Sequence, residues 1–223
     1  MLALWIDIGE HARLESKQGY GGSDMAKIKM EMGSGPVPIL SAYPVIIVGA
    51  NTDEKPDFTT ATWTGVACSN PPMITVALQH HRYVLKGIRQ NMTFSVNIPS
   101  TDIVKETDYC GLVSGSKMDK AKDCKFSVFH GKLENAPLIE QCPINHVCEV
   151  VQILNLGSHE LVVGKIIETH VSSECMTDGR PDPDKTKPFL FVGGKYMALG
   201  KAVANSFEAG KTVNPKAKVE GPR

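Results

Sequence analysis

The sequence has no excess of charge of either sign and no long hydrophobic run. Its 223 residues include 24 basic and 24 acidic side chains, so the formal net charge is zero. Without an overall positive field, attraction to nucleic acid or to an anionic membrane surface is not expected. No apolar run approaches the roughly 20 residues that span a bilayer, and the apolar start Leu2 to Ile8 lacks the preceding basic residue of a secretory signal. We expect a cytoplasmic protein with neither a nucleic-acid nor a membrane partner.

Cysteines are few and scattered for a chain of this length. There are six, and none of the spacings is that of a small disulfide-rich scaffold, which favours a reducing compartment. One short segment does hold soft metal ligands, at Cys142, His146 and Cys148. It lacks a second pair of ligands and lies where a strand would alternate its side chains between two faces. We therefore expect no metal site there.

The motifs of the common nucleotide and hydrolase sites are also missing. No GxGxxG follows a strand, no P-loop is present, and no GxSxG turn supplies a nucleophilic serine. Gly193-Gly194 lies between two strand-like runs, where a tight turn is the more common use of such a pair. Any phosphate recognition must therefore come from a local set of residues.

The regular apolar pattern begins only after Met25. We expect residues 1–24 to be an appended or flexible extension, residues 25–207 to form one domain, and residues 208–223 to be a poorly ordered polar tail. Within the domain, β-branched and alternating runs separated by Gly, Pro and Asn predict many short strands. The expected strands are Val37 to Gly49, Phe58 to Ala67 with its distal turn, Met73 to Leu78, Thr93 to Pro99, Val147 to Leu154, Leu161 to Val171, Phe189 to Val192 and Lys195 to Gly200.

Helices are expected only as short inserts. Val84, Leu85 and Ile88 can share one helical face, and a second helix is expected from Thr101, as its N-cap, to Tyr109. Residues 111–120 read as a loop that leads into a third short helix. This pattern favours a mostly β fold with an antiparallel barrel over an alternating βαβ fold.

The most informative run is Thr59 to Gly65, which is rich in hydroxyls and is followed by the Cys68 to Pro72 turn. Hydroxyls and backbone amides can hydrogen-bond a flat heteroaromatic ring without the bulk of long side chains. On a single strand, Thr60, Thr62 and Thr64 would share one face and would need water or a polar ligand. Trp63 is expected to pack in the core or at an interface.

A cationic cluster follows the third expected strand at His80, His81 and Arg82, with Lys86 close by. Such a cluster can bind phosphate through charge-assisted hydrogen bonds; an exposed, solubilising turn is the alternative. His159 lies at an expected hairpin tip, where it is either simply exposed or, in a cofactor cleft, suited to proton handling.

Taken in order, six segments resemble the flavin reductase-like FMN-binding split-barrel family, most closely its flavoredoxin branch. They are TTATWTGVACSNPP at 59–72, HHRYVLKGI at 80–88, FSVNIPS at 94–100, DYCGLVSGSKMDK at 108–120, NLGSHELVVGKI at 155–166 and PFLFVGGKYMALG at 188–200. Each is weak alone, and their common order over most of the chain carries the resemblance.

The resemblance implies a homodimer of Greek-key split barrels with FMN near the subunit interface. It assigns the flavin ring to Thr60, Ala61, Thr62, Trp63, Cys68 and Ser69, and the phosphate to His80, His81, Arg82 and Lys86. It also implies that Asn97, Ser114 and Lys120 complete the pocket, the last two possible contributions of the partner chain, and that His159 lies near the reacting part of the flavin. The chain departs from the family in having His80-His81 and Val84 where the family usually has Lys-Ser and a threonine, so two phosphate-binding hydroxyls are missing.

The implied activity is an FMN-dependent oxidoreductase. Electrons would come from NADH or NADPH, or from a redox protein partner, and would pass through FMN to a flavin, ferric or protein acceptor. One alternative is an FMN-containing electron carrier without nicotinamide-dependent activity. Another is a binding module for a different phosphate compound, or for a metal at Cys142, His146 and Cys148.

Overall fold

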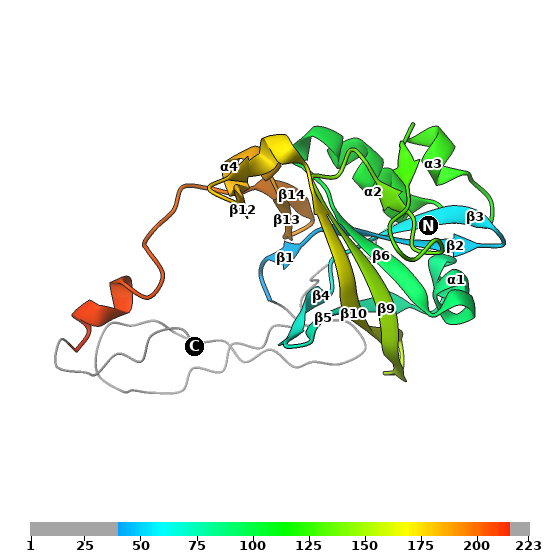
Figure 1. Cartoon of the computed structure of the whole chain (residues 1–223), viewed down its shortest axis with the longest axis horizontal. Helices are drawn as coiled ribbons and strands as arrows, with labels where there is room; N and C mark the ends of the chain where they lie inside the picture. Colours follow the sequence, from blue (N-terminus) through cyan, green and yellow to red (C-terminus); the bar gives the residue numbers. More distant parts are fainter. Residues whose placement is uncertain (1–39, 215–223) are drawn as a thin grey trace, which may run out of the picture.

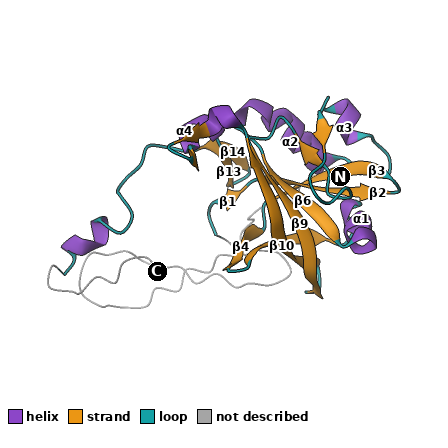
Figure 2. Ribbon diagram, viewed as in Figure 1, coloured by secondary structure: helices purple, strands orange, loops and turns teal. Residues whose placement is uncertain are grey.

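The structure is a computed structural model that describes residues 40–214, and it is dominated by β-strands (Figures 1 and 2). The segments 1–39 and 215–223, which include the expected extension and most of the tail, lie outside the described residues. The strands are β1 Tyr43–Pro44, β2 Ile46–Thr52, β3 Lys55–Ala61, β4 Thr64–Ser69, β5 Pro72–Gln79, β6 Thr93–Ile98, β7 Val128–Phe129, β8 Leu138–Ile139, β9 Ile144–Asn155, β10 His159–Val171, β11 Met176–Thr177, β12 Arg180–Pro181, β13 Phe189–Val192 and β14 Lys195–Ala198.

Helices are short, as expected. They are α1 Val84–Asn91, α2 Val104–Leu112, α3 Lys120–Asp123 and α4 Pro183–Thr186, with single 3-10 turns at Thr101–Ile103, Ser173–Cys175 and Ala209–Thr212. The last of these lies in the tail, where residues 208–214 are all exposed. No helix among residues 40–214 is long and apolar enough to cross a membrane.

Seven strands form the main sheet, in the order β3-β2-β6-β9-β10-β5-β4, and every neighbouring pair is antiparallel. The expected mostly β, antiparallel architecture is confirmed. The long β9–β10 hairpin turns at residues 156–158, where Gly157 has a φ of 87° and its amide donates to Asn155 Oδ1 at 3.1 Å. The expected hairpin at Gly193-Gly194 is also present, joining β13 to β14 beside β1 in a separate small sheet.

Three sequence expectations about boundaries are wrong. The expected strand from Val37 to Gly49 is divided, in its described part, between β1 and β2, and β2 continues to Thr52 because Asp53 and Glu54, with φ of 50° and 64°, make the turn alone. The segment from Phe58 to Ala67, expected to be one strand with its distal turn, instead belongs to two strands, β3 and β4, separated at residues 62–63. The helix expected from Thr101 to Tyr109 begins as the 3-10 turn Thr101–Ile103, capped by Ser100, whose Oγ accepts from the amide of Asp102 at 3.3 Å, and α2 itself starts only at Val104, without a side-chain cap.

The core lies on both sides of β2. On one side α1 packs the fully buried Val84, Leu85 and Ile88 against the sheet, as their spacing predicted. On the other side α2 and α3 lie together beside β3 (Figure 1), over a second cluster in which the rings of Phe58 and Phe126 meet edge to face at 5.9 Å. This second side also supports one end of the candidate functional site.

Gly164 in β10 offers a test of this packing. A methyl group added there would lie 2.4 Å from Cζ of the fully buried Phe94 ring, whereas one added at Gly65 in β4 would meet nothing within 4 Å. Gly164→Ala is therefore expected to lower the free energy of unfolding by about 1–3 kcal/mol through overpacking. Gly65→Ala is the control, and urea unfolding measures both. Equal midpoints for the two variants would contradict this account of the core.

Candidate functional site

Polar and aromatic side chains from several segments gather where β5 ends and β10 begins. Antiparallel pairing places His159, the first residue of β10, opposite Gln79, the last residue of β5. The break between β3 and β4 is held beside β5 by a backbone hydrogen bond of 2.8 Å from Ala77 to Trp63. The structure therefore brings together three segments that the sequence singled out separately: residues 60–63, 80–82 and 157–159.

Trp63 and His159 form the aromatic part of this region. Their rings stack with centroids 4.5 Å apart and planes inclined by 21°. Ser158 Oγ lies 2.8 Å from His159 Nδ1 and helps to orient the imidazole. Burial lowers the pKa of His159, and the nearby positive charges of His80, Arg82 and His81 lower it further. The imidazole of His159 is thus held neutral in a positively charged setting.

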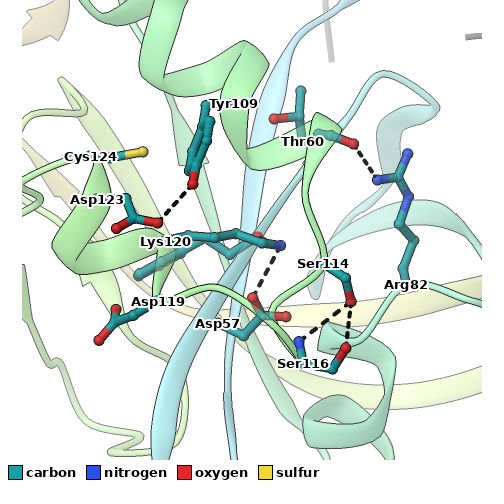
Figure 3. Close-up of polar contacts among 12 residues, drawn as sticks. Asp57, Thr60, Arg82, Tyr109, Ser114, Ser116, Asp119, Lys120, Asp123 and Cys124 are labelled. Atoms are coloured by element: carbon teal, nitrogen blue, oxygen red, sulfur yellow. Dashed lines mark hydrogen bonds and ion pairs between the residues drawn. The ribbon is translucent and has the colours of Figure 1, made fainter. Parts of the chain in front are cut away.

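Arg82 is the central cation of the region. Its side chain is half-buried, and Nη1 donates to the carbonyl oxygen of Gly111, at the end of α2, at 2.7 Å. Thr60 lies next to Arg82 at this end of α2 (Figure 3), and its hydroxyl donates to the carbonyl oxygen of Thr107. Burial lowers the pKa of Arg82, yet a guanidinium stays charged in proteins. Among residues 40–214, no carboxylate lies within ion-pair distance of Arg82.

His80 is already bound to the protein on both ring nitrogens. Nδ1 lies 3.1 Å from Glu160 Oε1, and Nε2 bonds the carbonyl oxygen of Gly157. Because both partners are acceptors, both bonds form only when the imidazole carries two N–H groups. Glu160 is buried and also pairs with Arg89, which lowers its pKa. Sequence reasoning missed Glu160, whose position directly after His159 is the only local sign of its role.

Lys86 points to a different part of the molecule from Arg82. Its ammonium group lies 2.6 Å and 2.7 Å from the two carboxylate oxygens of Asp53, in the β2–β3 turn. Both side chains are about half exposed, at 52% and 55%, so the pair adds little to stability. The remaining cation of the expected phosphate cluster, His81, is exposed and makes no hydrogen bond within residues 40–214.

The three threonines expected on one strand face have different surroundings. Thr60 is bonded to α2, and the hydroxyl of Thr64 donates to the carbonyl oxygen of Thr75 at 2.8 Å. Only Thr62, half-buried at the strand break, has no hydrogen-bond partner in the part of the chain that the structure describes. Ala61 is buried beside it. At the end of β4, half-buried Cys68 and exposed Ser69 pair with Met73 and Pro72 of β5, and their side chains make no hydrogen bond within residues 40–214.

Two residues expected in the pocket lie inside the protein instead. Asn97 is fully buried, and its amide binds the carbonyl oxygen of Ile47, Ser95 Oγ, the amide of Ile139 and Asn145 Nδ2 at 2.8–3.1 Å. This network uses the polar atoms of Asn97 to join β2, β6, β8 and β9, so the structure gives it a role in the core.

Lys120 is the second of these residues. Its side chain is 2% exposed, its ammonium group lies 3.1 Å from Asp57 Oδ1, and it also bonds the carbonyl oxygen of Phe58 (Figure 3). Lys120 therefore neutralises a buried carboxylate beneath the loop and does not face the surface. Ser114, on the same loop, is exposed and bonds Ser116 Oγ at 2.9 Å.

The soft ligands at Cys142, His146 and Cys148 do not converge. Cys142 and Cys148 are buried in different hydrophobic clusters, and His146 Nδ1 lies 2.9 Å from Thr169 Oγ1. No group of three or more potential ligands that could hold a metal was found among residues 40–214.

Comparison with known proteins places this geometry in a family. The model of the flavin reductase like domain matches residues 40–200. Flavoredoxin from Methanosarcina acetivorans is 34% identical, with a TM-score of 0.78 over 84% of this chain and 100% of that chain. Flavoredoxin of Desulfovibrio vulgaris (Miyazaki F) is 30% identical, with a TM-score of 0.74 over 82% of this chain and 100% of that chain.

A more distant structure, an FMN-binding protein from Thermus thermophilus crystallised with 1-cyclohex-2-enone, is 21% identical, with a TM-score of 0.69 over 80% of this chain and 100% of that chain. At this identity it supports the fold alone. The split-barrel architecture expected from the sequence is confirmed by the structural neighbours, which include flavoredoxins and flavin reductases with this fold. The chain belongs to the flavin reductase-like family and is similar to its flavoredoxins.

Proposed function

We propose that the protein is an FMN-dependent oxidoreductase of the flavin reductase and flavoredoxin type. The observation that carries the proposal is the half-buried charge of Arg82, which has no carboxylate partner among residues 40–214. A partly desolvated cation is costly unless an anion pairs with it. The phosphate of FMN is such an anion, and family membership makes a flavin the fitting ligand.

The donors around Arg82 fit this ligand. Arg82 retains free guanidinium N–H groups beyond its bond to Gly111, and exposed His81 adds a second donor. The hydroxyl of Thr62, the backbone amide of Trp63 and the side chains of Cys68 and Ser69 have no hydrogen-bond partner within residues 40–214, and they suit the edge of the flavin ring. Ser114 would complete the site from the loop after α2. FMN would supply the redox chemistry, while these residues bind and orient it.

His159 would respond to the bound phosphate. Positive neighbours help to hold its pKa below the ordinary value in the protein alone. A phosphate dianion beside Arg82 would offset those charges and raise the pKa of His159. The imidazole would then hold a proton close to the cofactor near neutral pH, as a general acid must.

A second copy of this chain is the partner that we propose. β4 is an edge strand of the main sheet, and Val66 on it is 83% exposed, while Leu156 at the β9–β10 turn is 60% exposed. Apolar side chains that flank a ligand site commonly mark a protein interface. A homodimer would cover the exposed side of the Trp63–His159 region. The six cysteines, all free, fit a reducing compartment such as the cytoplasm.

The choice of electron donor is tested by anaerobic stopped-flow mixing of the FMN-loaded protein with NADH or NADPH. Rapid bleaching of the flavin band by one of them is the result expected for a reductase. Bleaching by a reduced ferredoxin-like protein alone would instead identify an electron carrier without nicotinamide-dependent activity, or a reductase with a protein donor.

A failure to bind FMN at all would contradict the proposal as a whole. Isothermal titration of the flavin-free protein with FMN, and with riboflavin as the matched ligand lacking phosphate, separates the contribution of the phosphate to the affinity from that of the flavin ring. We expect FMN to bind more tightly because Arg82 and His81 face the phosphate. Equal affinities would show that the phosphate makes no contact with this cluster.

A further inference from the structure

Two cysteines outside the proposed flavin site lie together between α2 and α3. Cys110 is on the buried face of α2, and Cys124 directly follows α3. Both belong to the hydrophobic cluster that packs against β2 and β3, where Cys110 is fully buried and Cys124 is at its partly exposed edge. The chain between them contains the loop of residues 113–119, so the two cysteines lie on either side of that loop in the sequence.

The contacts of Cys124 place its thiol beside Cys110. Its Sγ lies 3.8 Å from the carbonyl oxygen of Glu106, and Glu106 is one helical turn before Cys110 on α2. Both side chains belong to the same hydrophobic cluster, and each thiol affects the pKa of the other. A disulfide forms only between cysteines that are such close neighbours.

The two thiols differ in acidity. The neighbouring Cys110 thiol lowers the pKa of Cys124, whereas the neighbouring Cys124 thiol and burial raise the pKa of Cys110. The thiolate is the nucleophilic form of cysteine. Because Cys124 is partly exposed and Cys110 is fully buried, Cys124 is the attacking sulfur of the pair, and Cys110 is the thiol that can resolve its oxidised product.

A cavity gives small molecules access to Cys124. It has a volume of about 340 Å³ and is lined by Lys105, Glu106, Tyr109, Asp123 and Cys124. Tyr109 donates to Asp123 Oδ2 at 2.7 Å across this cavity, next to Cys124 (Figure 3). The cavity is large enough for several waters and hence for a hydroperoxide, whereas Cys110 is not among its lining residues.

We propose that Cys110 and Cys124 form a peroxide-oxidised dithiol, with Cys124 as the reacting thiol and Cys110 as the resolving thiol. The Cys124 thiolate attacks one oxygen of hydrogen peroxide, the O–O bond breaks, and hydroxide leaves, giving a sulfenic acid at Cys124. Cys110 sulfur then attacks the sulfenic sulfur, and hydroxide leaves with the Cys110 proton as water. Overall, two thiols and one peroxide give one disulfide and two waters.

The disulfide would tie α2 to α3 across the 113–119 loop. Closing a loop with a covalent bond restricts the motion of the residues between its ends. Reduction by a small dithiol would restore the two free thiols. The restrained loop carries Ser114, and Cys110 is next to Gly111, whose carbonyl oxygen bonds Arg82, so the cross-link would also restrain this side of the proposed flavin site.

The test uses the full chain, native and folded, treated with hydrogen peroxide and then blocked with an alkylating reagent. Peptide mass spectrometry should find a Cys110–Cys124 disulfide with the loss of two thiols per chain, and dithiothreitol should restore both. Cys110→Ser should instead accumulate a sulfenic acid at Cys124, trapped by dimedone, and Cys124→Ser should form neither product. Cys175→Ser, at a buried cysteine distant in sequence, is the control and should behave as wild type.

Circular dichroism and thermal melts confirm that each variant is folded before oxidation. If Cys110→Ser does not fold, a Cys110→Ala variant replaces it in the same assay. Oxidation of the pair only after unfolding, or preferential oxidation of other cysteines in the folded chain, would overturn the proposal. So would a dimedone adduct on Cys110 in place of Cys124.

Discussion

Arg82→Ala is expected to weaken FMN binding by about 10- to 100-fold, because one charge-assisted hydrogen bond contributes about 1.5–3 kcal/mol. In the structure its half-buried guanidinium bonds only the carbonyl oxygen of Gly111 and lacks a carboxylate partner among residues 40–214. Titration of the flavin-free protein with FMN, followed by flavin fluorescence, measures the change. Arg82→Lys should lose less affinity, since it keeps the charge but not the planar donor geometry.

Arg180→Ala is the matched control for the loss of an arginine. Arg180 is exposed on β12, outside the Arg82 region, so its removal should leave FMN affinity unchanged. Riboflavin adds a second comparison, because Arg82→Ala should affect its affinity much less than that of FMN. An Arg82→Ala protein that is folded and binds FMN as tightly as wild type would show that the phosphate binds elsewhere.

Lys120→Met is expected to destabilise the protein by about 3–5 kcal/mol near neutral pH, because it leaves the buried carboxylate of Asp57 without its cation. Urea unfolding measures the loss. The double variant Lys120→Met with Asp57→Leu should recover most of it, since an apolar pair of similar volume needs no charge compensation. Lys122→Met, at an exposed lysine of the same helix, is the control.

The loss of stability caused by Lys120→Met should become smaller as the pH falls. Burial raises the pKa of Asp57, and Lys120 opposes that rise; without Lys120 the folded-state pKa is higher still. The folded variant then binds a proton more readily than the unfolded chain as the pH falls toward the ordinary carboxyl value of about 4. Its stability relative to wild type should therefore recover between about pH 7 and pH 4. A pH-independent difference would show that the loss comes from packing and not from the unpaired charge.

Local patterns in the sequence were sufficient for most of the secondary structure. The β-branched runs that became β5, β6, β9 and β10 alternate with a period of two, and Asn155 to His159 carries its own turn chemistry. Val84, Leu85 and Ile88 similarly predicted the buried face of α1. The wrong predictions concern boundaries: Ser100 is as suitable a cap as Thr101, and only the backbone path shows that Ser100 caps a 3-10 turn and that α2 starts at Val104.

The candidate site was only partly predictable. Sequence order placed His80 to Arg82 after a strand and His159 at a hairpin, and the β5–β10 pairing then brought them together. The order of residues in the sequence did not show that Glu160 and Gly157 would hydrogen-bond both ring nitrogens of His80, nor that Asp53 would pair with Lys86. Each of these contacts joins residues far apart in the chain, so no local pattern encodes it.

The sequence by itself determined the family, the antiparallel β architecture and the segments in which the polar residues of the site lie, because these depend on periodicity, turn residues and ordered motifs. Only the tertiary structure decided which polar side chains remain available to a ligand. Inside the protein, Asn97 hydrogen-bonds Asn145 and Lys120 pairs with Asp57. Arg82 and Thr62, in contrast, keep donors without a partner among residues 40–214. The reason is physical: a buried polar group must find a partner, and which partner it finds depends on the packing of strands and helices that are distant in sequence.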